Sequence, residues 1–110
     1  MASQPTQNID QLSESYVTIA QFLDQNGIAY TPTSLRYRID DLSNNAQVLA
    51  WTPISPAPNV VITIPSALNE MTNLNDLVEI RQVLLEITAP GGALRYDDVT
   101  YNLIRIFGLT

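Results

Sequence analysis

Three residue types are missing from this 110-residue chain: it has no cysteine, no histidine and no lysine. Without cysteine and histidine the chain cannot build a thiol nucleophile, a disulfide, an imidazole base or a Cys/His zinc site. Without lysine it has neither Schiff-base chemistry nor a phosphate-loop lysine. Because the remaining Ser, Thr, Asp and Glu show no catalytic spacing, we predict a protein that is not an enzyme and uses no cofactor.

Positive charge is also scarce. All five basic residues are arginines and stand against 11 Asp and Glu, which gives a formal net charge of −6. An acidic chain lacks the basic surface that nucleic-acid binding requires, so we expect no nucleic-acid partner. No run of 18 apolar residues could span a bilayer, and residues 1–10 lack the cationic and apolar parts of a signal peptide. We therefore expect synthesis in a cytoplasm and no membrane partner.

Residues that favour extended backbone are abundant in the middle of the chain. Over residues 34–40 polar and apolar side chains alternate, which is the period of a strand with one face in water. Turn-forming residues at 41–45 and a partner strand at 48–52 follow, and prolines then interrupt the pattern. Alternation resumes at 60–64 and again at 94–107. With 45% hydrophobic residues, the chain is expected to fold as one all-β domain.

Two segments fit a helix as well as a strand. Apolar residues recur at helical spacing over 12–23, ahead of Gly27, where a helix could end. A similar stripe runs over 77–87 before the turn residues 89–92, and Ser66 could cap a single helical turn. Helices in both segments would make an α+β domain, whereas strands throughout would make a sandwich of about seven strands. Periodicity favours the sandwich.

The N-terminal residues are polar. Within 1–11 the one aliphatic anchor is Ile9, which is too little apolar surface to order such a segment by itself. We predict a flexible arm over 1–13, ordered by a neighbouring molecule if at all, and a single domain over 14–110.

The stretch YTPTSLRYRIDD at 30–41 and its continuation VLAWTP at 48–53 resemble small fibronectin-III or immunoglobulin-like modules carried by tailed bacteriophages. The segment 59–65 and the turn SALN at 66–69 extend the resemblance, which covers roughly residues 14–107. It implies a single antiparallel immunoglobulin/fibronectin-III-like β-sandwich with one short helical turn. The chain departs from the fuller pattern of these modules in two ways. It has no tyrosine near the start of the strand expected at 77–88, where a tyrosine corner would lie, and it has no cysteine pair to form a disulfide between the sheets. The strands implied are 16–23, 35–40, 48–52, 60–64, 77–88 and 94–106.

Such phage modules are similar to decoration, cement, tail or neck proteins. The resemblance therefore implies a non-enzymatic structural protein of the virion, made in the host cytoplasm, that decorates or cements the capsid. Its partners would be the major capsid protein or other virion proteins. Attachment as a homo-oligomer, such as a trimer at local threefold positions, would multiply a modest affinity per copy. The alternative is a carbohydrate-binding or adhesive module on the virion surface, or a tail or neck component.

Several side chains are candidates for an interface. Trp51 is suited to stacking on a sugar ring or anchoring a protein contact, although the sequence favours core packing for it. Arg36 and Arg38 share one strand face and pair well with carboxylates. The loops 53–59 and 89–93 are natural contact points because loops on a rigid scaffold carry recognition. The candidate interface residues are Ile9, Arg36, Arg38, Trp51, Pro56, Pro58 and Pro90.

Two pairs of adjacent carboxylates are conspicuous: Asp40 with Asp41, and Asp97 with Asp98. Neighbours on a strand point to opposite faces, so neither pair converges on one atom unless the backbone turns there. The turn at 41–45 could hold a weak calcium site, but hydrogen bonding to the local backbone is the favoured interpretation. For the second pair we favour solvated charges near a hairpin. We predict no bound metal.

Overall fold

A computed structural model describes residues 7–106, which fold almost entirely into strands. The all-β class is therefore confirmed, and the α+β alternative is wrong because both ambiguous segments are extended. Among residues 7–106 the one helix is a four-residue turn, and no helix there is long and apolar enough to cross a membrane. The elements are β1 (Gln7–Asp10), β2 (Ser15–Ile19), β3 (Phe22–Leu23), β4 (Ala29–Tyr30), β5 (Ser34–Asp41), β6 (Ala46–Ile54), β7 (Val60–Ile64), the 3₁₀ helix η1 (Ser66–Asn69), β8 (Val78–Thr88) and β9 (Leu94–Ile104).

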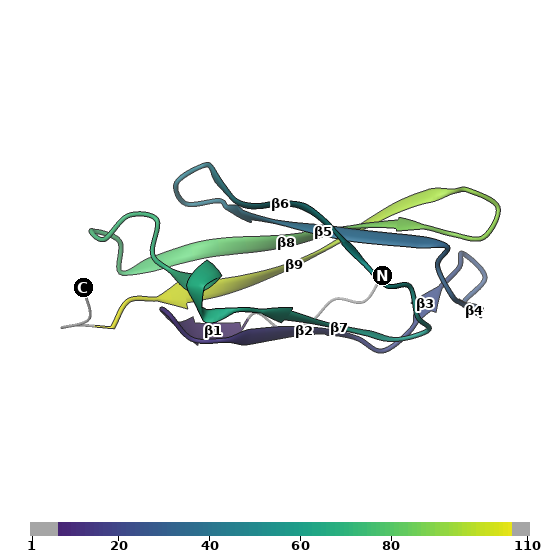
Figure 1. Cartoon of the computed structure of the whole chain (residues 1–110), viewed down its shortest axis with the longest axis horizontal. Coiled ribbons are helices and arrows are strands. Elements are labelled where there is room, and N and C mark those ends of the chain that lie inside the picture. The colour runs from purple at the N-terminus through teal and green to yellow at the C-terminus, as the bar shows by residue number, and fades with distance from the viewer. Residues whose placement is uncertain (1–6, 107–110) are drawn as a thin grey trace.

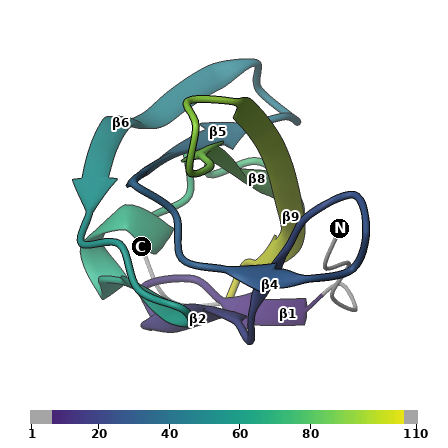
Figure 2. The same ribbon diagram turned by 90° about the vertical axis from the view of Figure 1, so that its right-hand side faces the viewer.

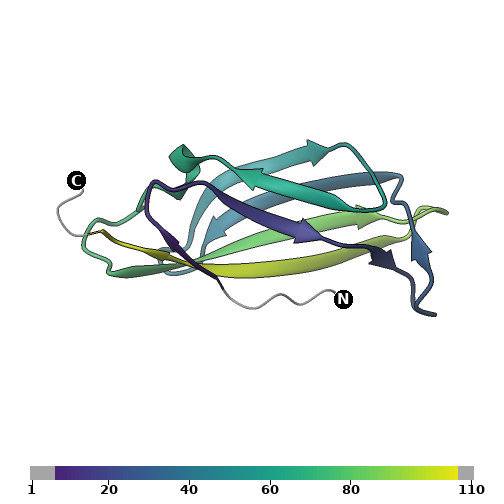
Figure 3. The same ribbon diagram turned by 90° about the horizontal axis from the view of Figure 1, so that it is seen from below.

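Two sheets lie face to face and enclose the core (Figure 1 and Figure 3). The larger sheet has five strands in the order β1-β9-β8-β5-β6, and β2 pairs with β7 in the smaller one. Seen from the end in Figure 2, the strands form a ring around this core. A short hairpin of β3 and β4 lies at one end (Figure 1). The pairing of β1 with β9 is parallel, so the strands are not antiparallel throughout as predicted.

Alternation along each strand determines which side chains enter the core. β5 buries every second residue from Leu35 to Asp41, and β8 does so from Glu79 to Ile87. Burial of each aliphatic side chain stabilises the folded state by about 1.5–3 kcal/mol. The chain has no cysteine, so this burial, and no disulfide, holds the two sheets together. The core consists of Val17, Ile19, Phe22, Leu35, Tyr37, Ile39, Val60, Ile62, Ile64, Met71, Val83, Leu85, Ile87, Tyr101 and Leu103.

The N-terminal region differs from the arm expected over residues 1–13. Residues 7–10 form β1, which pairs with the end of β9, and the half-buried Ile9 packs against the core. Gln11 is buried, and its Oε1 accepts a hydrogen bond from the backbone N–H of Ile106 at 2.7 Å. Backbone pairing with β9 supplies the order that one aliphatic side chain could not supply alone. Residues 1–6 of the predicted arm lie outside the described residues.

Three further features differ from the sequence-based expectation: the strand at 16–23, the role of Gly27 and the cap of η1. The segment expected as one strand over 16–23 is divided between β2 and β3. Gly27 has a φ of +77° and serves the β3–β4 turn, where Asp24 accepts hydrogen bonds from the N–H groups of Asn26 and Ile28. The predicted cap at Ser66 is wrong, because Ser66 lies inside η1 and the N-cap is Pro65, with no side-chain capping bond.

Candidate functional site

Three side chains singled out in the sequence meet on the outer face of the five-stranded sheet. The guanidinium groups of Arg36 and Arg38 both lie over the Trp51 ring, with their Cζ atoms 4.5 and 5.7 Å from the ring centroid. At these distances the cations are attracted to the ring's negative face. Glu86 on β8 and Tyr96 on β9 adjoin them. We call Arg36, Arg38, Trp51, Glu86 and Tyr96 the outer aromatic face.

The pairing of β5 with β6 determines where Trp51 points. Tyr37, which is buried, stands opposite Thr52, so the neighbouring Trp51 faces the outside beside the arginines. β6 is the last strand of its sheet, and none of its residues is fully buried. Trp51 is therefore half-buried on an outer face, and the core position favoured for it in the sequence is wrong.

Both arginines of this face are held by two-point ion pairs. Nε and Nη2 of Arg36 donate to Glu86 at 2.8 and 3.0 Å, and those of Arg38 donate to Asp40 at 3.0 and 2.8 Å. The hydroxyl of Tyr96 donates to Glu86 at 2.9 Å. The hydrogen bonds from Arg36 lower the pKa of Glu86, and the bond to Glu86 raises the pKa of Tyr96. The result is a charge-balanced, preorganised surface in which the Arg36 side chain is 42% exposed.

The other predicted interface residues lie apart from this face. Pro56 and Pro58 are exposed after β6, and Pro90 is exposed between β8 and β9. The strand registers bring these two loops to the same end of the molecule. Ile9 stands opposite Leu103 near the other end and is half-buried. The structure thus brings together the arginines and the tryptophan, places three prolines at one end, and separates Ile9 from all of them.

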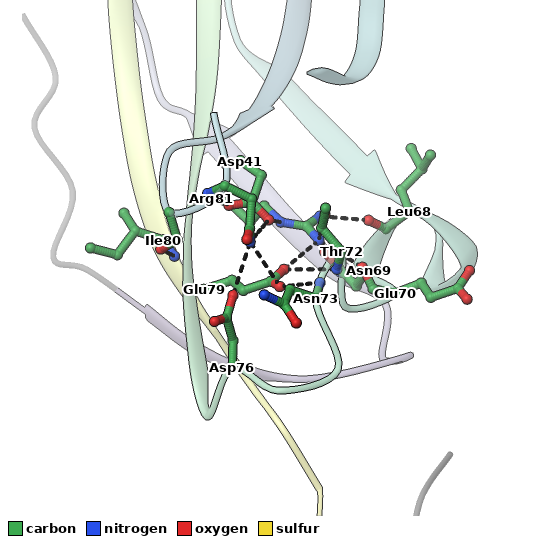
Figure 4. Close-up of polar contacts among 12 residues, drawn as sticks. Asp41, Leu68, Asn69, Glu70, Thr72, Asn73, Asp76, Glu79, Ile80 and Arg81 are labelled. Carbon is green, nitrogen blue, oxygen red and sulfur yellow. Dashed lines mark hydrogen bonds and ion pairs between the residues drawn. The ribbon is translucent and has the colours of Figure 1, made fainter. Parts of the chain in front are cut away.

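A second polar cluster is buried between β5, β8 and the segment from β7 to β8 (Figure 4). Arg81, Glu79 and Asp41 are each 0% exposed. Nε of Arg81 donates to Asp41 at 3.2 Å, and Nη2 donates to Glu79 at 3.0 Å. The same guanidinium donates to the carbonyl oxygens of Leu68 and Glu70 at 2.9 and 2.6 Å. We call the following set the Arg81 network: Asp41, Asn44, Thr72, Asn73, Asp76, Glu79 and Arg81.

Glu79 holds the same segment, between β7 and β8, through two of its backbone N–H groups. Its carboxylate accepts hydrogen bonds from the backbone N–H groups of Thr72 and Asn73 at 3.0 and 2.8 Å. Asn44, in the turn after β5, presents its side-chain nitrogen to the network's carboxylates. The segment 65–77, which contains η1 and no strand, is therefore fixed by side chains of β8.

The two buried carboxyl groups of the network have displaced pKa values in opposite directions. Burial raises the pKa of Glu79, and a hydrogen bond with Asp41 raises it further. Burial also acts to raise the pKa of Asp41, but hydrogen bonds with Glu79 and Asn44 bring it below its ordinary value. Both groups accept hydrogen bonds from the guanidinium of Arg81, Asp41 from its Nε and Glu79 from its Nη2.

Reasoning from the sequence missed Glu79 and Arg81. The signal was present, because both residues are in phase with the apolar residues 83, 85 and 87 of the same segment. A charged residue at a strand position that faces the core needs partners there. The phase therefore indicates a buried ionic cluster but does not identify its other members, which come from distant parts of the chain.

The predicted carboxylate pairs do not converge. Asp40 faces outward to Arg38, whereas Asp41 faces inward to Arg81, so the turn offers calcium no common point between them. Asp41 also accepts a hydrogen bond from the backbone N–H of Asn44 at 3.0 Å, as the favoured interpretation of this turn predicted. Asp98 accepts one from Gln82 at 2.9 Å. Within residues 7–106 no group of acidic side chains has the arrangement of a metal site.

One cavity of about 230 Å³ lies between the start of β9 and the β2–β3 segment. Its lining is largely apolar, with Ile19, Phe22 and Ile87 among its members, and includes Arg95 and Asp97 from β9. This combination could hold an apolar group, but it contains no nucleophile beside a base.

Comparisons with known proteins found no relative of this chain. No family model matches the chain, and no curated protein or solved structure matches it. Two features of its own geometry are therefore the basis for a function: the outer aromatic face, and the buried Arg81 network that fixes the segment before β8.

Proposed function

We propose that this protein is a non-enzymatic structural module of a tailed-bacteriophage virion, an immunoglobulin- or fibronectin-III-like β-sandwich that binds the assembled shell as a decoration or cement protein. The outer aromatic face supplies the contact surface, and its geometry is the observation that carries the proposal. The assignment to a virion draws on the resemblance of residues 30–53 to phage modules.

The outer aromatic face has the chemistry of a protein-binding surface. Tryptophan, tyrosine and arginine are enriched at interfaces and dominate their binding energy. Ion pairs to Glu86 and Asp40 already hold both arginines in place, so little side-chain freedom is lost when a partner binds. The described chain extends over 50 × 23 × 19 Å, which leaves a broad sheet face for the about 800 Å² per partner of an ordinary interface.

The proposed partners are the major capsid protein or other virion proteins. Decoration of a symmetric lattice needs only modest affinity per site if several copies attach as one oligomer, for example a trimer. The exposed loops with Pro56, Pro58 and Pro90 lie at the end of the module and supply further contacts in this arrangement.

Binding of the protein to assembled shells tests the proposal directly. Shells of the phage that encodes the protein are incubated with it, and occupancy is measured by electron microscopy and cosedimentation. Trp51→Ala is expected to weaken binding by about 30-fold, as loss of an interface anchor does. Tyr16→Ala is the matched control, because Tyr16 is an aromatic residue that is 50% exposed in β2, outside the larger sheet. Failure of the unaltered protein to bind, or equal binding by Trp51→Ala, would contradict the proposal.

A cement role also predicts how particles behave when the protein is missing. Particles that lack the protein should assemble but withstand heat and osmotic shock less well than complete particles. If they were equally robust and lost host adsorption instead, the carbohydrate-binding alternative would take the lead. The geometry favours the protein contact, because the Arg36 guanidinium already lies 4.5 Å from the Trp51 ring centroid, on a ring face that a sugar would otherwise stack on.

A further inference from the structure

We propose that the free edge of β7 pairs with β7 of a second copy of this chain. The two strands run antiparallel about a twofold axis through Ile62, and they join the two smaller sheets into one sheet of four strands, β2-β7-β7-β2. This pairing goes beyond the shell contact proposed above, because it joins two copies in free solution.

The edge of β7 that faces away from β2 is open. β7 pairs with β2 over residues 60–64, and among the described residues no strand of the smaller sheet lies beyond it (Figure 3). Apart from this pairing, the backbone of β7 makes no hydrogen bond within residues 7–106. An edge strand of this kind offers its unpaired N–H and C=O groups to another strand.

Burial indicates which backbone groups point to this edge. Ile64 is 0% exposed and Ile62 is 3% exposed. Buried backbone groups are nearly always paired, so the N–H and C=O groups of these two residues face β2. Along an antiparallel pair, hydrogen-bonded and non-hydrogen-bonded positions alternate. The N–H and C=O groups of Val61 and Thr63, which are both exposed, therefore face the free edge.

The outward groups of one copy match those of a second copy. About an axis through Ile62, Val61 of each copy lies opposite Thr63 of the other, with the outward groups of both residues facing each other. Such a pair exchanges two N–H···O=C hydrogen bonds. The pairing thus satisfies the N–H and C=O of both residues in both copies. Because both copies use the same edge, the contact closes at two copies.

The distribution of charge selects this side of the molecule for a contact between copies. None of the 5 basic and 11 acidic residues lies within 42–69, the segment that contains β6, β7 and η1. β6 and β7 lie along the same side of the sandwich (Figure 1 and Figure 3). Two copies with a formal charge of −6 each repel one another, whereas the centre of a protein interface is depleted of charge.

Apolar side chains on this uncharged side are incompletely covered. Val61 is 58% exposed on β7. Pairing of the two β7 edges brings the uncharged sides of both copies together, so burial of apolar surface adds to the backbone hydrogen bonds. The half-buried hydrophobic residues of this segment that pack against the core are Val48, Leu49, Ile54, Ala57 and Leu68.

The other strand edges carry features that oppose such pairing. β6 contains Pro53, and its register with β5 is irregular in two places. β1 has four residues and ends at Asp10. β2 follows Glu14, whose carboxylate accepts a hydrogen bond from the Tyr16 hydroxyl, so a negative charge lies beside that strand. β7 has a regular register and contains neither proline nor charge.

Sedimentation of the unaltered protein tests whether the dimer forms. The dimer fraction should rise with protein concentration up to about 1 mM, as mass action requires. A protein that stays monomeric throughout this range would overturn the proposal. Because no shells are present, this result is separate from the shell-binding measurement.

Two double variants that differ only at position 63 test the edge. Val61→Glu with Thr63→Glu places carboxylates opposite each other across the axis and should raise the dissociation constant of the dimer at least about 100-fold. Val61→Glu with Thr63→Arg is the matched control, because it places a carboxylate opposite a guanidinium and should stay within about tenfold of the unaltered protein. Equal association of the two double variants would overturn the proposal.

Single cysteines test the register, since the chain has no cysteine of its own. In the proposed dimer the Cα atoms of residue 61 and of residue 63 in the other copy are about 5.5 Å apart, within the range that a disulfide spans. Identical positions are diagonal neighbours at about 7–8 Å, too far apart for the bond. Oxidation of Val61→Cys mixed with ¹⁵N-labelled Thr63→Cys should therefore give covalent dimers that contain one copy of each, as mass spectrometry can measure. Covalent dimers of one variant with itself in equal or greater yield would contradict the pairing.

Discussion

Arg36 and Arg81 make the same kind of ion pair in opposite surroundings. Arg36 binds Glu86 on the outer face with 42% of its side chain exposed, whereas Arg81 binds Asp41 and Glu79 with none exposed. Water and salt screen the first pair, so it contributes little to folding. The second has no water to replace its partners, so its loss leaves buried charges.

The phase of each residue in its strand decides between these two outcomes. Along β8, Glu79 and Arg81 share the phase of the core residues, whereas Glu86 has the opposite phase. A charge in the core phase is used by the fold to fix a neighbouring segment. A charge in the outer phase stays accessible to a partner. Substitution of the first type of residue should therefore alter stability, and substitution of the second type should alter the binding that we propose for the outer aromatic face.

The largest expected effect is that of Arg81→Met. This change removes the one cation of the network and leaves Asp41 and Glu79 buried without it, so the free energy of unfolding should fall by about 3–5 kcal/mol. Denaturant unfolding followed by circular dichroism measures the loss. Arg36→Met is the control and should unfold close to the unaltered protein. Equal stability of the two variants would contradict the comparison.

Two tyrosines allow the same comparison of a buried with an outer side chain, with a smaller expected loss of stability. Tyr101→Phe removes the buried hydroxyl that donates to Asn69, a residue with 0% exposure, and should cost about 1–2 kcal/mol. Tyr96→Phe removes a hydroxyl that donates to Glu86 on the outer face, where water can replace it. Thermal unfolding should therefore show a lower midpoint for the first variant alone. A shared decrease would mean that the outer hydrogen bond also supports the fold.

The strands that are predictable from the sequence are those whose limits are marked by residues within the strand or directly beside it. The predicted strand 60–64 coincides with β7, because its alternation is unbroken and Pro65 follows it. The shared face of Arg36 and Arg38 was also predicted, since it needs only the two-residue period. Both inferences rest on neighbours in the chain.

Features that depend on distant residues were not predictable in this way. β1 is a strand because it pairs with the end of β9, and nothing in residues 7–10 themselves indicates that partner. Trp51 faces outward because of the β5–β6 register, which contains irregularities between Tyr37 and Asp40. The segment 65–77 takes its course from Glu79 and Arg81. In each case tertiary contacts either overrode the local pattern or supplied the order that the local pattern lacked.

The pH dependence of stability should distinguish the two regions further. Glu79 has a raised pKa in the folded state, so its contribution is present below 4.5, its unfolded value, and is lost as pH rises through the folded pKa. Asp41 and Glu86 have lowered pKa values, so their contributions are present above 3.8 and 4.5 and are lost as pH falls through the folded values. Thermal midpoints should therefore be highest at mildly acidic pH. Glu79→Gln should remove the decline on the alkaline side alone.

Among the variants that are not controls, the smallest expected loss of stability is that of Trp51→Ala. Trp51 is half-buried on the last strand of its sheet, so its removal should lower the free energy of unfolding by about 1 kcal/mol. Leu85→Ala is the control for a core side chain: Leu85 is 1% exposed, and its truncation should cost about 2–5 kcal/mol. Chemical unfolding of both variants, next to shell-binding measurements on Trp51→Ala, separates the two roles. If Trp51→Ala were as unstable as Leu85→Ala, the tryptophan would be a structural residue, and its loss of binding would no longer identify the outer aromatic face as the contact surface.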